Sequence, residues 1–397
     1  MQVMIDAIII FLFCAALFLV IYHHILYPAL LKVATKDKII NTTKIGHRSY
    51  VFSEKDNKMT RFSIIIPAFN EAKYIADKIR NLSVIDYPSD RYELILICDG
   101  CQDNTYEIAL NTLNELSCND LHYQLINLEE NQGKVAVLKT GVNLAKFDNI
   151  VFSDVSALLP VNSLLMLDSH FKLPVVGAVS GGYQFMNKDS AGEQCYWEYQ
   201  STLKSRESSV ASVLGAHGAF YAVRKSCYQD IPADTINDDF LIPMNVIKQG
   251  YRVIYDARVV AIELEHVNLE QDMNRRLRIA AGNFQQLIYL LPLLSPRYGW
   301  NAINFASGKG LRAIMPFILV FIFLSNLYLL NSQSLFLATF ICQTFLYSIV
   351  LVINFFKISP HLNILKLMCY LVNGYWVALK GSLRYIFGLQ EKVWTKI

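Results

Sequence analysis

An alternation of short apolar runs with helical patterns limits the fold of this chain more than any other feature of its sequence. Four runs have the length and composition of β-strands: 62–67 (FSIIIP), 93–98 (ELILIC), 123–127 (YQLIN) and 149–154 (NIVFSD). Apolar residues at helical spacing fill the segments between them: 71–82, 103–116 and 134–145. Strand, helix and strand in this order predict right-handed crossovers and a mostly parallel sheet covered by helices on both faces. We therefore expect a Rossmann-like α/β fold.

The two ends of the chain are strongly apolar. The chain is 53% hydrophobic and only 17% charged, against about 25% charged in ordinary soluble domains. Residues 7–22 carry no charge and, with residues 23–31, reach the roughly 20 residues that cross a bilayer. Two more runs begin at Leu311 and Leu335. A further run, 362–378, is interrupted by polar residues and predicts either a span or an interfacial amphipathic helix.

Charge around the first run predicts its orientation. A cleaved signal peptide is the alternative, but no Lys or Arg precedes the run and no small-residue cleavage site follows it. Lys32 and Lys36 follow the run, whereas only Asp6 precedes it. The positive-inside rule therefore predicts a multi-pass protein of the cell membrane with a cytoplasmic middle domain. The small net charge of +3 favours no nucleic-acid partner.

Polar loops follow the predicted strands: AFNEAKYI, DGCQDNT, NQGK and DVSALLP. In open parallel sheets, ligands bind at the carboxyl ends of the strands. Neither a G-x-G-x-x-G dinucleotide fingerprint nor a P-loop is present in the sequence. The loops are acidic instead, which favours a nucleotide whose phosphates are held through a metal ion.

A resemblance rests on seven segments in a fixed order. They are SIIIPAFNEAKYIADKI, LICDGCQDNT, NQGKVAVLKTG, FSDVSALLP, GAHGAFYAVRK, INDDFLIPMNVIKQGYRVIYD and RRLRIAAG. From about Phe62 to Gly282 the chain resembles the processive family-two glycosyltransferases of GT-A fold, the membrane synthases of poly-N-acetylglucosamine, hyaluronan and cellulose type. The resemblance implies a membrane segment at 1–31, a linker at 32–60, a cytosolic GT-A domain at 61–283, an interfacial segment at 284–310, and two or three membrane helices with a tail at 311–397.

The resemblance also implies a site for a UDP-sugar. The residues expected to line the uridine are Pro67, Ala68, Asn70, Glu71 and Asp99. An aspartate suits this contact because a carboxylate can accept the uracil N–H in a charge-assisted hydrogen bond. Alternatively, Glu71 is the first residue of a helix and only interacts favourably with the helix dipole. The alternative for Asp99 is a residue that only forms a turn. Lys134 is expected to contact phosphate, and an exposed lysine at a helix start is the alternative.

Asp154 is the expected metal ligand. The family shows Asp-x-Asp here, whereas this chain has Asp154, Val155 and Ser156. Magnesium commonly takes one or two protein carboxylates and completes its shell with water and substrate phosphates. One carboxylate can therefore hold Mg²⁺ or Mn²⁺, with Ser156 adding a hydroxyl or acting through water.

The pair Asp238 and Asp239 matches the family's Thr-Glu-Asp motif. Transfer to an alcohol needs a base beside the acceptor oxygen, and we assign that role to Asp239, with Asp238 as its coupled neighbour. The alternative is a pair of acidic residues that only starts a helix.

Arg275 and Arg278 are expected to steady the departing UDP, because guanidinium groups pair with phosphate oxygens. A basic helix on anionic lipid is the alternative. Ile279 stands where the family has a tryptophan, so polymer extension and single addition both stay open.

The expected reaction is inverting transfer of a hexose or N-acetylhexosamine from a UDP-sugar to a hydroxyl of a saccharide or glycolipid acceptor, in cell-surface or extracellular polysaccharide synthesis. The alternatives are a single-addition transferase with a lipid-linked acceptor and a non-catalytic partner of another synthase. Membrane lipid is an expected partner. Three or four spans are few for a polymer conduit, so a partner subunit or homodimer is also expected.

Overall fold

The computed structural model describes residues 1–36, 58–185, 191–265, 269–358, 360 and 362–389. The chain divides into two compact units. The helical unit comprises 1–34, 190–197 and 272–390, and the sheet unit comprises 35–189, 198–271 and 391–397. Most of the predicted linker, residues 37–57, lies outside the described residues.

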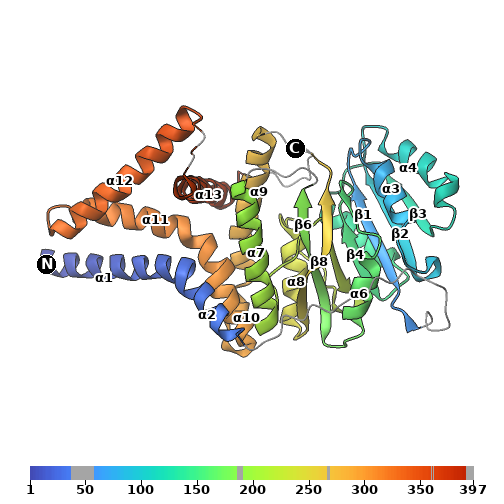
Figure 1. The fold of residues 1–397 in the computed structure, drawn as a ribbon, viewed down its shortest axis with the longest axis horizontal. Coiled ribbons are helices and arrows are strands. Elements are labelled where there is room, and N and C mark those ends of the chain that lie inside the picture. Colours follow the sequence, from blue (N-terminus) through green and yellow to red (C-terminus); the bar gives the residue numbers. More distant parts are fainter. Residues whose placement is uncertain (37–57, 186–190, 266–268, 359, 361, 390–397) are drawn as a thin grey trace. The chain divides into compact units, whose positions relative to one another are not determined.

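The sheet unit is built on one eight-stranded sheet in the order β3-β2-β1-β4-β7-β6-β8-β5 (Figure 1). Its strands are β1 (Phe62–Ala68), β2 (Tyr92–Asp99), β3 (Tyr123–Leu128), β4 (Asn149–Ser153), β5 (Ala157–Leu158), β6 (Val176–Phe185), β7 (Phe220–Arg224) and β8 (Arg252–Glu263). The pairings among β1 to β4 are parallel. Beyond β4, β7 and β5 each pair antiparallel with their neighbours, while β6 and β8 pair in parallel. The prediction of a mostly parallel α/β sheet is confirmed, with an antiparallel part that the sequence analysis did not describe.

Helices cover both faces of the sheet because successive side chains of a strand point to opposite faces. On one face, Ile64 and Ile66 of β1 join a core with Ile75 and Ile79 of α3. On the other face Ile65 meets α5, where a Cβ on Gly141 would lie 2.5 Å from its side chain. The helices around the sheet are α3 (Ile75–Ser83), α4 (Thr105–Leu113), α5 (Lys134–Leu144), α6 (Ser163–Phe171) and α8 (Asp238–Lys248).

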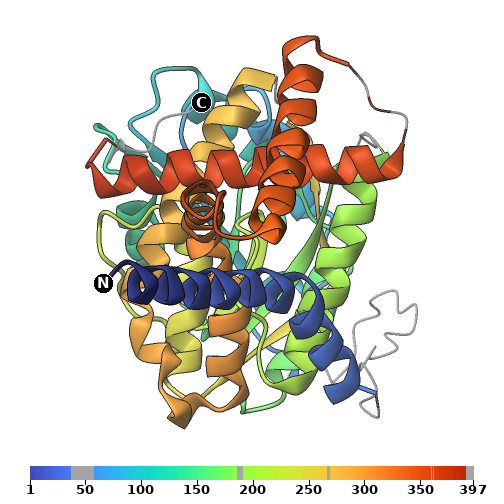
Figure 2. The same cartoon turned by 90° about the vertical axis from the view of Figure 1, so that its left-hand side faces the viewer.

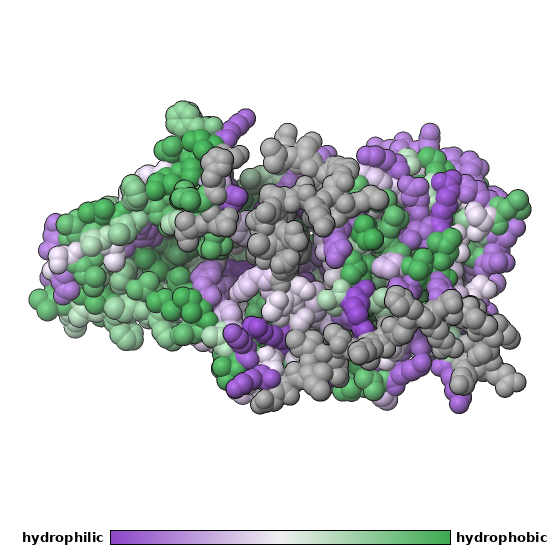
Figure 3. All heavy atoms as spheres, viewed as in Figure 1, coloured by the Kyte–Doolittle hydropathy of each residue, from purple (hydrophilic) through white to green (hydrophobic). Residues whose placement is uncertain are grey.

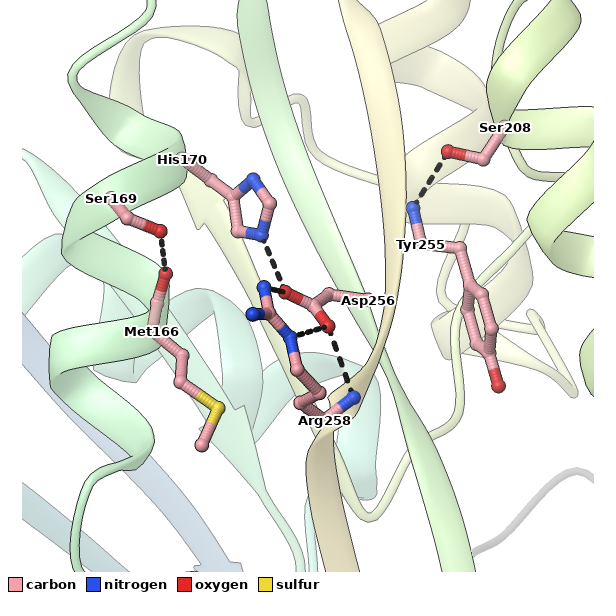
Figure 4. Close-up of polar contacts among 7 residues, drawn as sticks. All are labelled: Met166, Ser169, His170, Ser208, Tyr255, Asp256 and Arg258. Atoms are coloured by element: carbon pink, nitrogen blue, oxygen red, sulfur yellow. Dashed lines mark hydrogen bonds and ion pairs between the residues drawn. The ribbon is translucent and has the colours of Figure 1, made fainter. Parts of the chain in front are cut away.

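A buried ionic cluster ties α6 to β8 (Figure 4). His170 Nε2 lies 2.9 Å from Asp256 Oδ2, and Arg258 donates to both oxygens of the same carboxylate. Burial alone would raise the pKa of Asp256, but the hydrogen bonds from Arg258 and His170 outweigh burial and hold this pKa well below its usual range. The cluster is a structural tether between a helix and the strand that it covers.

The helical unit contains helices long and apolar enough to cross a membrane. Three such helices occur among the described residues: Gln2–Ala34, Trp300–Tyr328 and Ser334–Phe355. This result confirms the prediction of membrane-length helices near both ends. The fourth predicted run forms part of α13, which is not among these three. Figure 3 shows the hydrophobic surface of α1, α11 and α12.

The elements of this unit are α1 (Gln2–Ile21), α2 (Tyr27–Ala34), α10 (Trp300–Asn304), α11 (Leu311–Tyr328), α12 (Ser334–Phe355) and α13 (Asn363–Ile386). Two further helices, α7 (Ala191–Val210) and α9 (Leu269–Tyr289), have residues in both units. Phe13 of α1 packs edge-on against Phe336 of α12, with ring centroids 5.4 Å apart. Figure 2 shows α13 lengthwise, crossing α12.

Candidate active site

Asp99 ends β2 and organises the loop that precedes α5. Its carboxylate is fully buried and accepts hydrogen bonds from the backbone N–H groups of Gln132 (2.8 Å) and Gly133 (2.9 Å). Charge-assisted bonds of this kind are roughly twice as strong as neutral ones. Asp99, at the end of its strand, therefore holds the loop that leads to Lys134 in place. Its contact with uracil stays a prediction.

The loops after β1, β2 and β3 are packed together. A Cβ on Gly100 would lie 2.4 Å from the backbone nitrogen of Asn131, and Gly100 has φ +62°, so only glycine suits this turn. Asn70 also has a positive φ, of 55°, and its side-chain oxygen accepts a hydrogen bond from the Gln102 N–H. The topology thus brings three predicted nucleotide loops into contact.

One local expectation needs correction. Pro67 and Ala68 end β1, paired with Ile97 and Cys98, and their contact with uridine stays a prediction. Glu71 does not open a helix, because α3 begins only at Ile75. Instead, the Glu71 N–H donates to Thr105 Oγ1 at 2.7 Å, which ties this turn to the start of α4.

Lys134 and three carboxylates form the centre of the site. Lys134 Nζ lies 3.0 Å from Asp154 Oδ1 and 3.9 Å from Asp238 Oδ1. Burial alone would lower the pKa of Lys134, but the nearby carboxylates outweigh burial and raise it above its ordinary value. Lys134, Asp154 and Asp238 come from α5, the end of β4 and the start of α8, so the fold gathers residues distant in sequence.

Asp239 lies beside Asp154 across Gly218. The Gly218 N–H donates to Asp239 Oδ2 at 2.9 Å. A Cβ on Gly218 would lie 3.4 Å from Asp239 Oδ2 and 3.6 Å from Asp154 Oδ2, so both oxygens border the same glycine. Burial, with the charge of Asp238, raises the pKa of Asp239 to about 6. A carboxylate with this pKa is suited to accept a proton near neutral pH.

A divalent cation suits the environment of Asp154. Asp154 Oδ2 accepts no hydrogen bond from any described residue, and the side chain is 36% exposed. In the described ranges, no three His, Cys, Asp or Glu side chains are grouped to hold a metal ion. Ser156 is buried, and its backbone carbonyl oxygen accepts a hydrogen bond from the Leu264 N–H at 3.0 Å. Asp154 can thus serve Mg²⁺ or Mn²⁺ as a single carboxylate donor, with substrate oxygens and water to complete the shell, and the contribution of Ser156 stays a prediction.

Arg275 and Arg278 lie on α9 in the helical unit. Arg275 Nη2 donates to Asp272 Oδ1 at 3.1 Å, and the Nε atom of Arg278 is buried without a hydrogen-bond partner in the described structure. Their contact with a departing diphosphate stays a prediction.

Four features of the sheet unit were missed by sequence reasoning. Lys78 is fully buried and donates hydrogen bonds to Ser153 and Ala157, on either side of the segment 154–156. The Tyr221 hydroxyl is buried with no partner among the described residues, and burial raises its pKa well above the ordinary value. His217 stacks on Tyr183, with ring centroids 4.0 Å apart. Glu263 belongs to β8, a strand the sequence analysis did not describe. Only the tertiary fold brings these residues to the site.

Comparison with known proteins agrees with this geometry. A mannosyltransferase from Pyrobaculum calidifontis, solved with GDP-Man and Mn²⁺, superposes with a TM-score of 0.70 at 20% identity, over 96% of this chain and 100% of that one. This likeness defines the fold class as GT-A. Residues 60–282, more than half of the chain, match the family model described as glycosyltransferase like family 2. The chain belongs to this family, which confirms the predicted resemblance.

Two curated relatives are similar to the same region. The poly-β-1,6-N-acetyl-D-glucosamine synthase of Staphylococcus aureus (strain COL) is 26% identical over 240 residues, which cover 58% of this chain and 57% of that protein. The synthase of the same name from Staphylococcus epidermidis is 24% identical over 250 residues, which cover 61% of this chain and 59% of that protein. The chain thus spans less than two thirds of the length of these relatives.

Proposed function

We propose that this chain is a membrane-bound inverting glycosyltransferase. It transfers a hexose or N-acetylhexosamine from a UDP-sugar to a hydroxyl of a saccharide or glycolipid acceptor, with its catalytic domain in the cytoplasm. The observation that carries this proposal is the cluster of Asp154, Asp238 and Asp239 around Lys134 at the carboxyl end of the sheet. Membership of the family and the polysaccharide-synthase names of the curated relatives support it.

Each group has a separate task in the proposed reaction. Asp239, beside Gly218, takes the proton of the acceptor hydroxyl as it attacks the anomeric carbon. Asp154 holds Mg²⁺ or Mn²⁺, which when bound draws the negative charge that develops on the diphosphate. Lys134 gives a second positive charge beside the leaving group. A single direct displacement inverts the anomeric centre and needs no covalent intermediate.

The uridine half of the donor is assigned to the packed loops around Asp99. Asn70 and Glu71 come from the turn after β1, and the bond from Asp99 to the Gly133 N–H connects these loops to Lys134. Arg275 and Arg278 are proposed to contact the departing UDP. Transfer into a cell-surface polysaccharide is part of the proposal, and the size of the product tests it.

The test uses the full chain in detergent or nanodiscs. Release of the nucleoside diphosphate, UDP from a panel of UDP-sugars and GDP from GDP-Man, is measured in Mg²⁺, Mn²⁺ or EDTA. We expect one UDP-sugar to be turned over in a metal-dependent manner. Product size then separates a polymer from a single addition to a lipid. An absence of turnover with every donor would favour a non-catalytic partner of another synthase.

A matched pair of lysine variants on α5 tests the site itself. Lys134→Met removes the cation between the carboxylates, whereas Lys139→Met removes a lysine that is 53% exposed and paired with Asp230 on the surface. We expect Lys134→Met to lower kcat/KM by at least about tenfold, in line with charge-assisted bonds worth about 1.5–3 kcal/mol. Lys139→Met should leave it unchanged.

A further inference from the structure

Lys78 is a fully buried lysine beneath the Asp154 turn. It lies on α3 with 0% of its surface exposed. Its amine donates to Ser153 Oγ at 2.7 Å and to the Ala157 carbonyl oxygen. These two acceptors stand on either side of Asp154, Val155 and Ser156. One amine thus closes the turn that carries the proposed metal ligand.

The hydrogen bonds continue from this turn toward Asp239. Ser153 Oγ, which accepts from Lys78, donates to the Ala219 carbonyl oxygen at 2.8 Å. The Asp154 N–H donates to the same carbonyl at 3.3 Å. The preceding residue, Gly218, donates its N–H to Asp239 Oδ2. A continuous path therefore joins Lys78 to both carboxylates.

Packing does not account for an amine at this position. Burying a polar group costs free energy even when it is hydrogen-bonded, and the cost grows with charge. No described carboxylate lies within ion-pair distance of Lys78 Nζ. A methionine of similar length would fill the same space without that cost. The two hydrogen bonds are formed by either a neutral or a charged amine, because each has at least two N–H groups.

We propose that Lys78 is a positioning residue that fixes the Asp154 turn relative to Asp239. The inference rests on the proposed function, in which Asp154 and Asp239 act on the donor diphosphate and the acceptor hydroxyl. Reaction between the two substrates requires their reacting atoms within about 3–3.5 Å, and a displacement of about 1 Å can cost 10²-fold in rate. Lys78 contacts neither Asp99 nor Lys134 in the described structure, so binding of UDP to the loops around Asp99 in the absence of a metal ion should not depend on it.

Three variants of the full chain test this role. Lys78→Met removes both hydrogen bonds, and Ser153→Ala removes the link to Ala219. His170→Asn is the matched control, because it breaks a buried tether of the same unit at Asp256, which pairs with Gly181, whereas Glu263 pairs with Phe185, roughly 13 Å along β6 at about 3.3 Å per residue. The measurements are kcat, KM for the donor, the Kd for UDP by calorimetry in EDTA, and the unfolding temperature.

We expect Lys78→Met to lower kcat by about 10²-fold, with the Kd for UDP changed by less than about twofold. Ser153→Ala should lower kcat by about tenfold, and the double variant should be no slower than Lys78→Met, because both act through one path. His170→Asn should lower the unfolding temperature and leave kcat unchanged. If Lys78→Met does not fold, Ser153→Ala decides alone. Unchanged kcat in the folded variants, or kcat and UDP affinity falling together, would overturn the proposal.

Hydrogen exchange tests the positioning without activity. In Lys78→Met, the amides of residues 154–157 and 218–219 should exchange faster, while those of 99–101 and 131–133 should not change. This readout separates the inference from the proposed function, because it applies even if the wild-type chain turns over no donor. Equal exchange in the variant and the wild type would also overturn the role of Lys78.

Discussion

Replacing Asp239 with asparagine should strongly lower turnover and stabilise the fold at the same time. The pKa of Asp239 is raised from 3.8 to about 6, chiefly by burial and then by Asp238. The folded chain therefore binds this proton more tightly than the unfolded chain, and the ionised carboxylate destabilises the fold at neutral pH. A shift of about two units corresponds to at most about 3 kcal/mol. Asparagine keeps an oxygen for the Gly218 N–H but carries no charge.

Ionisation of Asp239 is needed for activity but lowers the stability of the fold. Catalysis needs the ionised form, so wild-type kcat/KM should fall as pH drops through about 6 and reach about one tenth near pH 5. The stability gained by Asp239→Asn should be present at pH 7 and vanish below about pH 4, where the aspartate is protonated in both states. At about 2–4 °C per kcal/mol for a unit of this size, the rise in unfolding temperature should be several degrees.

The assay combines steady-state UDP release between pH 4.5 and 8 with thermal unfolding in EDTA at pH 7 and pH 4. Loss of a general base should lower kcat by about 10²–10⁴-fold. Asp77→Asn is the control, because Asp77 lies in the same unit with its side chain 60% exposed. Turnover by Asp239→Asn within tenfold of wild type, or a lower unfolding temperature at pH 7, would refute the reasoning.

Three further outcomes follow from the site and its scaffold. Asp154→Ala should raise the Mn²⁺ concentration needed for half-maximal UDP release by at least about tenfold, since it removes the proposed protein ligand; an unchanged activation curve would contradict this. Gly100→Ala should weaken UDP binding and lower the unfolding temperature by an amount equivalent to about 1–3 kcal/mol, because its Cβ would meet the Asn131 backbone. Asp256→Asn should lower stability above about pH 4, where the wild-type carboxylate is ionised and paired, and leave kcat intact; equal melting curves at pH 7 would speak against the tether.

The first half of the sheet was predictable because three of its four strands, β1, β2 and β4, are buried on both faces. Such strands appear in the sequence as continuous apolar runs, and the four predicted runs match β1 to β4 to within one residue at either end. The second half was not, because β6 and β8 contain Gly181, Gly182, Arg252 and Arg258, and their register shifts at a bulge. In an irregular strand with polar residues, the apolar residues do not recur at the two-residue spacing that predicts a strand.

The acidic and basic residues of the site were found as separate motifs, but their contacts were not predictable. Asp154 and Lys134 are twenty positions apart, and their 3.0 Å contact depends on how β4 and α5 pack. Lys78 carried no signal, since a lysine in an amphipathic helix is usually placed in solvent. Its burial follows from the position of α3 over the end of β4.

The sequence by itself determined the family, the α/β class and the membrane-length helices, because these depend on local patterns of apolar residues and on motifs in a fixed order. The tertiary structure alone decided that Lys134 pairs with Asp154, that Gly218 donates to Asp239, and that a buried amine closes the Asp154 turn. These features depend on contacts between residues far apart in the chain. Burial and the distance between charges set the energies of these contacts, and local sequence patterns predict neither quantity.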